Sequence, residues 1–220
     1  MTTPELINLD ADEPLDLMEW VQSNTRWLVI GAVVVLIGGG GWWLYVQSRT
    51  TREVNASKAL FLAKQSVQSG NSVLAQSDLA KLVDRYNGTS AGSEGAMLLA
   101  QIDYDQAKYQ EGITTLEDAA KSAPEAMQSQ IRGLIGDGYL SMKNPASAAK
   151  QFEQAADLTD REIERGASRA RAARAYTISG DTAKARQLWT DLVGDEKNAA
   201  VAAEAKVRLG ELTAKPAKTS

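Results

Sequence analysis

The pattern of apolar positions is dominated by one uninterrupted run near the N-terminus. Residues 27–46 (WLVIGAVVVLIGGGGWWLYV) are twenty consecutive positions without a charged side chain. A hydrocarbon core of about 30 Å is crossed by roughly twenty helical residues, and lipid offers the backbone no hydrogen-bond partners, so an isolated run of this length must be helical. Aromatic rings, which prefer the headgroup level, mark both ends of the run: Trp27, Trp42, Trp43 and Tyr45. We therefore predict a single transmembrane helix over residues 27–46.

A cleaved signal peptide is the alternative interpretation of this run, and its flanks argue against it. Signal peptides begin with a basic segment, contain roughly 7–15 apolar residues and end at a site with small residues. Here the preceding 26 residues are acidic, the apolar run is longer, and Gln47, Ser48 and Arg49 follow it. We expect an anchor that is not cleaved.

Beyond the run, a longer repeat governs the apolar positions. Four turns are predicted at Gly70, Ala107, Lys143 and Gly180, which are 37, 36 and 37 residues apart. A small residue lies five positions after each turn: Ala75, Gly112, Ala148 and Ala185. A large apolar residue lies four positions further on: Leu79, Leu116, Phe152 and Trp189. Small side chains let two antiparallel helices approach closely, so the pattern predicts a series of helical hairpins.

The repeat ends in one unpaired helix, residues 199–213, which would cap the stack as terminal repeats require. Strand signals are scarce and good helix formers are plentiful. The predicted fold is all-α, with a single N-terminal transmembrane helix, an α-solenoid of about four helical hairpins and a capping helix. The expected domains are an acidic leader (1–26), the span (27–46), a linker helix (47–55), the repeat domain (56–213) and a disordered tail (214–220).

The hairpin pattern resembles the tetratricopeptide repeat, whose usual period is about 34 residues. Residues 99–124 (LAQIDYDQAKYQEGITTLEDAAKSAP) carry the resemblance best, with Tyr109 after the turn and Pro124 at the end. The chain departs from the family pattern because Asp103 stands where an aromatic residue is usual and because the period is two or three residues longer. We expect the additional residues in the loops between hairpins.

One span, a short acidic leader and about four degenerate repeats together resemble the YfgM-type family of membrane-anchored proteins. The resemblance is carried by Trp42, Trp43 and Tyr45 at the end of the span, by the linker helix that follows and by the repeats, and it covers most of the chain. It implies an ancillary, chaperone-like subunit that is associated with the Sec translocon and with periplasmic chaperones of bacteria. It brings no catalytic motif.

Composition excludes several classes of function. The chain has no Cys and no His, which removes thiol nucleophiles, His-based acid–base catalysis and Cys/His ligation of zinc, haem or iron–sulfur clusters. The net charge of −4 arises in the leader, and nothing resembles the basic footprint of a nucleic-acid binder. We expect a protein that is not an enzyme and has no cofactor, metal, nucleic-acid partner or small-molecule substrate.

The leader contains Leu15, Met18 and Val21 at helical spacing beside acidic residues. This spacing favours a helix lying at the membrane interface, and the acidic residues favour a protein partner over anionic lipid. A disordered acidic arm is the alternative, and the sequence leaves it open.

Four consecutive glycines interrupt the span: Gly38, Gly39, Gly40 and Gly41. Glycine weakens a helix by about 1 kcal/mol relative to Ala, but in membranes it lets another backbone approach closely. The spacing of a G-x-x-x-G dimer is absent, because Val35 and Trp42 lie four residues after Gly31 and Gly38. The patch is interpreted either as a docking site for a partner helix or a pigment-like ring, or as the flexible end of a plain anchor.

An arginine stripe and three tyrosines are the candidate binding residues of the repeat domain. Arg161, Arg165 and Arg169 share one face if a helix continues through Gly166. Such a stripe would hold an acidic peptide, lipid headgroups or carboxylates of a partner. The alternative is a solvated face paired with Glu162 and Glu164. The inner helices of the second and third repeats are the expected binding surface, with Tyr104, Tyr139 and Tyr176 nearby; the alternative places these tyrosines in the core.

The two topology signals disagree. Arg26 precedes the span, whereas Arg49, Arg52, Lys58 and Lys64 follow it, and by the positive-inside rule this favours a cytoplasmic repeat domain. However, long domains translocate largely regardless of charge, and the family arrangement places the repeats in the periplasm. We expect a single-pass protein of the bacterial inner membrane, with a cytoplasmic N-terminus and a periplasmic repeat domain.

The predicted function is protein binding at a membrane. The expected partners are the lipid bilayer and an integral membrane protein complex, exported proteins, or both. One role is a transient accessory, assembly or chaperone-like factor, such as one acting at the Sec translocon. The alternative is a permanent structural subunit that braces a photosynthetic reaction centre–antenna complex or a respiratory complex.

Overall fold

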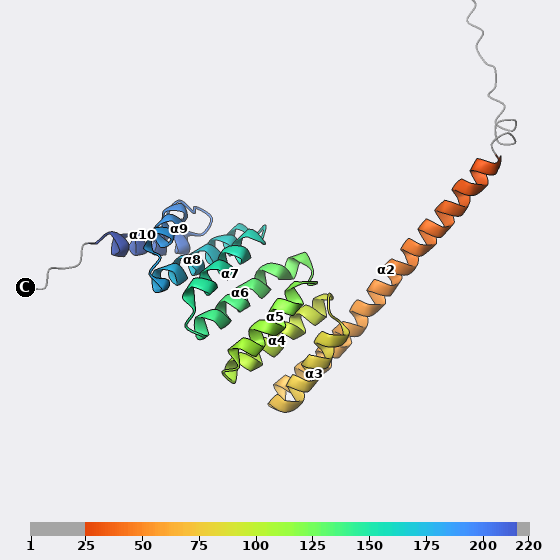
Figure 1. Cartoon of the computed structure of the whole chain (residues 1–220), viewed down its shortest axis with the longest axis horizontal. Coiled ribbons are helices and arrows are strands. Elements are labelled where there is room, and N and C mark those ends of the chain that lie inside the picture. Colours follow the sequence, from red (N-terminus) through yellow and green to blue (C-terminus); the bar gives the residue numbers. More distant parts are fainter. Residues whose placement is uncertain (1–24, 215–220) are drawn as a thin grey trace, which may run out of the picture. The chain divides into compact units, whose positions relative to one another are not determined.

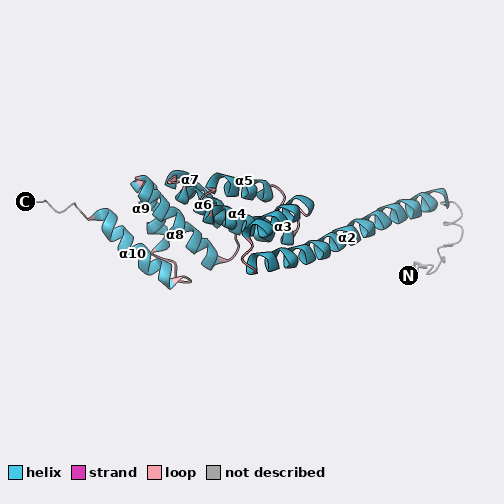
Figure 2. Ribbon diagram, turned by 90° about the horizontal axis from the view of Figure 1, so that it is seen from below, coloured by secondary structure: helices cyan, strands magenta, loops and turns pink. Residues whose placement is uncertain are grey.

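The computed structural model describes residues 25–214. The predictions for the leader before Thr25 and for the tail after Ala214 lie outside the described residues. Within the described range the chain consists of helices and loops, without a strand (Figure 2). The chain divides into two compact units, residues 1–50 and 51–220.

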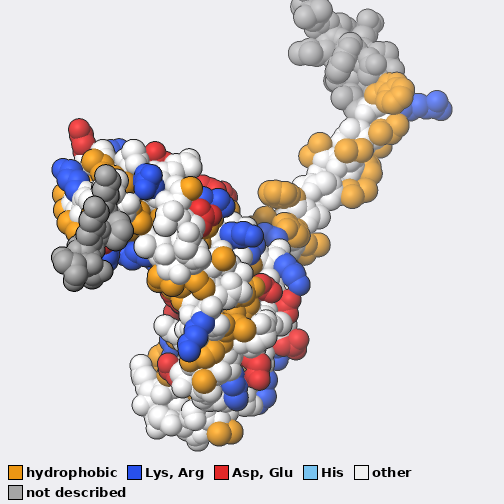
Figure 3. Space-filling view, turned by 60° about the vertical axis from the view of Figure 1, so that its left-hand side comes forward, with side chains coloured by type: hydrophobic (Ala, Val, Ile, Leu, Met, Phe, Trp, Pro, Cys, Tyr) orange, Lys and Arg blue, Asp and Glu red, His pale blue; other side chains and the backbone are white. Residues whose placement is uncertain are grey.

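The first unit contains the N-terminal part of α2, a continuous helix over Thr25–Gln68. Among the described helices, α2 is the one that is long and apolar enough to cross a membrane, and its most apolar window has a mean hydropathy of 1.9. Figure 3 shows apolar side chains along this part of α2. Residues 27–46 are helical, as the sequence predicts, and residues 47–55 continue the same helix.

The second unit combines the C-terminal part of α2 with eight further helices of the described chain. Their bounds are α3 (Ser72–Arg85), α4 (Ser90–Asp105), α5 (Tyr109–Ala120), α6 (Glu125–Ser141), α7 (Pro145–Asp157), α8 (Glu162–Ser179), α9 (Thr182–Leu192) and α10 (Ala199–Thr213). The helices pair into four hairpins, α2/α3, α4/α5, α6/α7 and α8/α9 (Figure 1). Each helix from α3 to α9 packs against the next one along the chain. The prediction of four hairpins and a final helix is confirmed.

Each predicted turn contains a left-handed backbone. The φ angles are +73° at Gly70, +60° at Ala107, +57° at Lys143 and +85° at Gly180. This conformation reverses the chain after the first helix of each hairpin. In three of the turns a polar side chain then accepts a hydrogen bond from the backbone amide three residues on: Asn71, Asn144 and Asp181. These caps satisfy amides that the following helix leaves without a partner.

The recurring small and large residues form the core of the repeats. The large residues Leu79, Leu116, Phe152 and Trp189 are each 0% exposed. Gly136 of α6 shows why the facing positions are small, because a Cβ atom there would lie 2.4 Å from the Phe152 ring. The burial therefore follows the spacing that the sequence predicts.

The expectation of longer loops between hairpins is wrong. These connections are the short segments 86–89, 121–124 and 158–161. The first helices of the later hairpins, α4, α6 and α8, contain 16, 17 and 18 residues. We infer that the additional residues of the period extend these helices.

Two side chains of α2 bind backbone groups where the first hairpin ends and the second begins. The Arg52 guanidinium donates to the carbonyls of Arg85 and Asn87, at 3.3 and 3.0 Å, where α3 ends. The Glu53 carboxylate accepts from the amide of Ser90 at 3.0 Å, where α4 begins. Both charges complement the dipole of the helix terminus that they contact.

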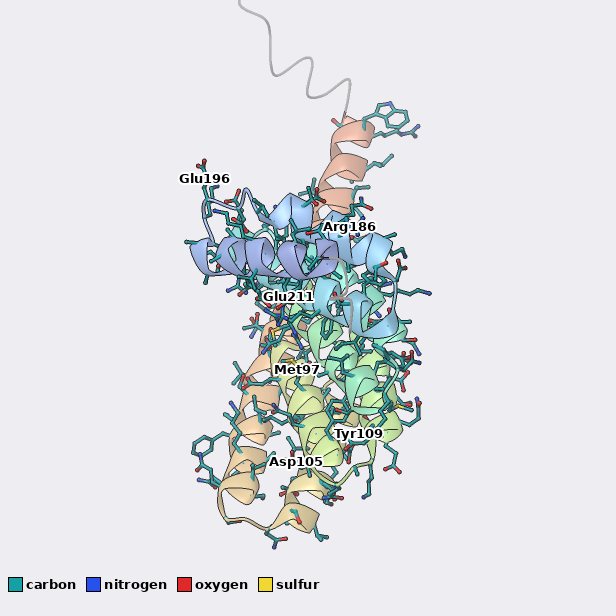
Figure 4. All side chains as sticks on the ribbon, turned by 90° about the vertical axis from the view of Figure 1, so that its left-hand side faces the viewer. Met97, Asp105, Tyr109, Arg186, Glu196 and Glu211 are labelled. Atoms are coloured by element: carbon teal, nitrogen blue, oxygen red, sulfur yellow. The ribbon has the colours of Figure 1, made fainter. Side chains whose placement is uncertain are left out.

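The last helix, α10, closes the C-terminal end of the repeats. Its Ala205 is buried in the same core cluster as Trp189 of α9. The Arg186 guanidinium of α9, labelled in Figure 4, donates to the Leu212 carbonyl of α10 at 3.2 Å. The bounds of α10 are those that the sequence predicts for the capping helix.

Candidate functional site: a groove between α6 and α8

A groove of about 1230 Å³ lies between α6 and α8, the first helices of the third and fourth hairpins. Both helices pack against α7. The side chains that line the groove include Glu125, Leu134 and Asp137 of α6 and Glu164 and Arg171 of α8. The connection between α7 and α8 supplies further lining residues, so the groove is built from segments of two hairpins.

The preceding pair of first helices shows how such a space is closed. Tyr104 of α4 reaches α6, where its hydroxyl donates to the Leu134 carbonyl at 3.2 Å. The ring fits because a Cβ atom at Gly112 or Gly138 would lie only 2.5 or 2.4 Å from Tyr104 atoms. In α6 the residue at the same distance before the turn is Leu140, which packs against the core cluster of the last two hairpins. The tyrosine bridge is therefore not repeated between α6 and α8.

One wall of the groove is organised around Arg171. Its guanidinium forms an ion pair with Asp137 of α6 and lies over the Phe152 ring, 4.1 Å from the ring centroid. An Arg over an aromatic face is attracted by the ring quadrupole. Gly133 leaves room for this arrangement, because a Cβ atom there would lie 3.3 Å from the Arg171 guanidinium. The Arg171 guanidinium therefore has its partners within the protein, Asp137 and the Phe152 ring.

The charge of the groove is predominantly negative. Two guanidinium groups line it, those of Arg161 and Arg171. Five carboxylates line it: Glu125, Asp137, Asp157, Asp160 and Glu164. In the described part of the chain no group of three or more His, Cys, Asp or Glu residues has an arrangement that would hold a metal ion. The groove therefore offers charge and shape for binding.

Comparison with known proteins agrees with this architecture. A family model described as a tetratricopeptide repeat-like domain matches residues 18–155, which is well over half of the chain. The chain belongs to the tetratricopeptide repeat-like domain family. Repeats of this kind form scaffolds for protein–protein interaction and are typically not enzymes. No curated protein matches the chain.

Solved structures share the tetratricopeptide-like fold at low sequence identity. The kinesin light chain TPR-like repeats of Podosopora anserina are 18% identical, with a TM-score of 0.55, over 72% of this chain and 85% of that one. BtubC (BKLC) from P. vanneervenii is 12% identical, with a TM-score of 0.54, over 77% of this chain and 70% of that one. At these identities the likeness shows the fold alone.

The predicted arginine stripe is divided among different environments in the tetratricopeptide-like unit. Arg161 precedes α8, lines the groove and pairs with Glu164 at 3.0 Å. Arg165 donates instead to the Thr159 carbonyl at 2.8 Å. Arg169 is half-buried and is not among the groove-lining residues. Arg161 is thus paired with a glutamate, as in the solvated-face alternative, whereas Arg165 binds a backbone carbonyl.

The predicted tyrosines link helices of the repeats. Tyr139 of α6 donates to Glu117 of α5 at 3.4 Å, and Tyr176 of α8 donates to Glu153 of α7 at 2.6 Å. Burial raises the pKa of Tyr104, Tyr139 and Tyr176 above its usual value. None of the three lines the groove. Their contacts agree with the core alternative that the sequence left open.

Asp103 explains one departure from the family pattern. It occupies the position of Tyr139 and Tyr176 in the second hairpin, and it is 7% exposed. Its carboxylate accepts a hydrogen bond from the Gln76 amide of α3 at 3.1 Å. Burial raises its pKa. A polar link to the preceding helix is thus kept although the aromatic ring is absent.

The glycine patch and the aromatic ends of the span lie in the first unit. A Cβ atom added at any residue of Gly38–Gly41 would meet no atom within 4 Å. Trp27, Trp42 and Trp43 are 74%, 69% and 64% exposed. Tyr45 is 50% exposed, and the Arg49 guanidinium lies 4.9 Å from its ring centroid. The structure thus leaves these surfaces open.

Sequence reasoning missed the acidic character of the groove. The signal was present as Asp157, at the end of one predicted hairpin, and Asp160, in the connection that follows it. Their relation to Glu125, more than thirty residues earlier, appears only when α6 and α8 lie on opposite sides of the groove.

Proposed function

We propose that this chain is a membrane-anchored, non-enzymatic scaffold that binds another protein in the groove between α6 and α8. The groove carries the proposal, because it is an open, charged surface formed where two hairpins meet. Its volume exceeds the roughly 300–1,000 Å³ typical of pockets for small molecules. A polypeptide segment is therefore a better match than a metabolite.

The anchor is the N-terminal part of α2. Its length and its exposed apolar surface support a single span over residues 27–46, with Trp27 at one interface and Trp42, Trp43 and Tyr45 at the other. On the YfgM-type resemblance, the span lies in the bacterial inner membrane and the repeats lie in the periplasm. The partner is then a membrane complex such as the Sec translocon, exported proteins, or both.

The orientation is tested with introduced cysteines, since the natural chain has none. Ser77 of α3 is exposed, so a Ser77→Cys variant is accessible to a membrane-impermeant maleimide. We expect labelling in intact spheroplasts. A Thr2→Cys variant in the leader serves as the control and should be labelled only after lysis. The reverse pattern would place the repeats in the cytoplasm, as the positive-inside count favours.

A permanent structural subunit is the second candidate, and the glycine patch favours it. Gly38–Gly41 present a smooth surface with no contact inside the chain, which suits close docking of a helix from a stable complex. A photosynthetic reaction centre–antenna complex or a respiratory complex is the kind of assembly that the sequence suggested.

Quantitative co-purification distinguishes the two candidates. The protein carries a tag after Ser220, is extracted in mild detergent, and its partners are counted by mass spectrometry. A substoichiometric mixture of translocon components and exported proteins supports the accessory factor. One stoichiometric set of membrane subunits that survives salt washing supports the structural subunit. Recovery of the chain alone would contradict both.

A further inference from the structure

The carboxylates of the groove differ in whether they are neutralised within the protein. Asp137 pairs with Arg171, and Glu164 pairs with Arg161. The remaining three lining carboxylates are exposed and form no ion pair with another described residue: Glu125, Asp157 and Asp160. The groove therefore has a net negative charge after its internal pairs are formed.

Local helix electrostatics explains only part of this charge. Glu125 is the first residue of α6, where a carboxylate is favoured by the helix dipole. Asp157 is the last residue of α7, where the same dipole disfavours a negative charge. A residue that opposes its local environment without a compensating bond marks a candidate functional position. Asp157 therefore supports a role in binding.

The groove also offers apolar contact between its charges. Leu158 follows Asp157 directly, and its side chain is 41% exposed. Leu134 of α6 and Ala167 of α8 line the same groove. A ligand that fills the space would cover these apolar side chains while it contacts the carboxylates. An extended segment with both basic and apolar side chains satisfies the two requirements.

We propose that the groove between α6 and α8 binds a polypeptide segment that carries Lys or Arg beside apolar residues. This inference rests on the proposed function, because it specifies the chemistry of the partner at the same site. The basic side chains pair with Glu125, Asp157 and Asp160, and the apolar side chains cover Leu158 and Leu134. Charge complementarity of this kind selects partners and accelerates their encounter.

Peptide binding to the full chain in detergent tests the charge preference. The probes are two fluorescein-labelled decapeptides of Leu, Ala and Ser, one with four Lys and the other with four Glu at the same positions. We expect the Lys peptide to bind and the Glu peptide not to bind, in fluorescence anisotropy at low salt. Salt should weaken the binding, because exposed ion pairs are screened. Equal binding of both peptides would overturn the proposal.

A variant in which the three unpaired carboxylates are neutralised tests whether the peptide binds in the groove. The triple variant Glu125→Gln, Asp157→Asn and Asp160→Asn should raise the Kd of the Lys peptide about tenfold. The matched control neutralises three exposed acids outside the groove: Asp84→Asn, Asp191→Asn and Glu196→Gln. The control has the same net charge and should retain the original Kd. If both variants lose the same affinity, the effect is non-specific and the proposal fails.

A steric variant separates this inference from the proposed function. Ala167→Trp fills the groove without a change of charge, and Ala183→Trp places the same ring on an exposed site of α9. Native partners are then recovered with each tagged variant. If the native partners are lost with Ala167→Trp but retained with the triple variant, the groove remains the binding site and the proposal of a basic ligand is overturned. If the native partners are retained with both variants, the proposal that the groove is the binding site is overturned. Circular dichroism confirms that each variant is folded.

Discussion

At the residue scale, backbone conformation sets the cost of each hairpin turn. Gly70 and Gly180 adopt positive φ angles with no side chain to clash. Ala107 and Lys143 adopt +60° and +57°, which costs a residue with a Cβ atom about 1–2 kcal/mol. The turns of the second and third hairpins are therefore strained relative to those of the first and last.

Lys143→Gly should relieve this strain. We expect the free energy of unfolding to rise by up to about 1 kcal/mol, since part of the gain is offset by the greater freedom of glycine in the unfolded chain. The matched control is Lys150→Gly in α7, where glycine should lower the stability by about 1 kcal/mol. Urea unfolding measures both. A loss of stability at both positions would show that the turn at Lys143 is not strained.

Gly136→Ala should lower the free energy of unfolding, in contrast to Lys143→Gly. Alanine usually favours a helix by about 1 kcal/mol over glycine, but here its Cβ atom would lie 2.4 Å from the Phe152 ring. Overpacking costs about 1–3 kcal/mol, so the variant should be less stable. Gly210→Ala in α10, where nothing lies within 4 Å, should be more stable. If Gly136→Ala also stabilises, the close packing of α6 on α7 is incorrect.

At the scale of elements, polar links join several pairs of packed helices over an alanine-rich core. Tyr176 and Glu153 join α8 to α7, and Arg174 and Glu204 join α8 to α10. In the latter pair the guanidinium donates to both carboxylate oxygens, at 2.7 and 2.5 Å. Bidentate pairs of this kind fix orientation as well as distance. The capping helix is thus attached by charge as well as by apolar contact.

The contribution of Glu204 should depend on pH. The Arg174 guanidinium lowers the pKa of Glu204 from its usual 4.5. A depressed pKa means that the contribution to stability is present above pH 4.5 and is lost as the pH falls through the lower, folded-state pKa. The difference in unfolding free energy between the wild type and Glu204→Gln should therefore shrink below pH 4.5. A constant difference between pH 7 and pH 3 would contradict the pairing.

At the scale of the whole molecule, the chain combines a repeat scaffold with an apolar helix that has open surfaces. The repeat unit satisfies its buried side chains internally, with Trp189 Nε1 the single buried side-chain polar atom without a partner in the described residues. By contrast, the glycine patch of α2 contacts nothing within the chain. The groove and the apolar part of α2 are therefore two open surfaces on which a partner has room.

Gly39→Ile tests whether a partner helix docks on the span. The chain itself has room for the side chain, so the variant should be expressed and extracted normally. We expect loss of the co-purified membrane subunit, because a bulky residue prevents close approach of helices. Gly31→Ile, which is also free of contacts in the chain, is the control. Unchanged recovery of partners with Gly39→Ile would identify α2 as a plain anchor.

The amino-acid sequence by itself determined the repeat. Turn positions, small residues and large apolar residues recur at one spacing, and each reports a local requirement of a helical hairpin. The four predicted turns all have positive φ, and the predicted large residues are all buried. The sequence also excluded chemistry that depends on Cys and His. These properties can be predicted from the sequence because they depend on residues that are close to one another along the chain.

The tertiary structure alone decided where a partner has room and which charges are free to meet it. Tyr104 closes the space between α4 and α6, whereas the space between α6 and α8 stays open. Arg171 is neutralised by Asp137, which lies 34 residues earlier. Asp157 keeps an unpaired charge on the same groove. The physical reason is that electrostatic pairing depends on distance in space, and the fold brings together groups that the linear pattern keeps apart.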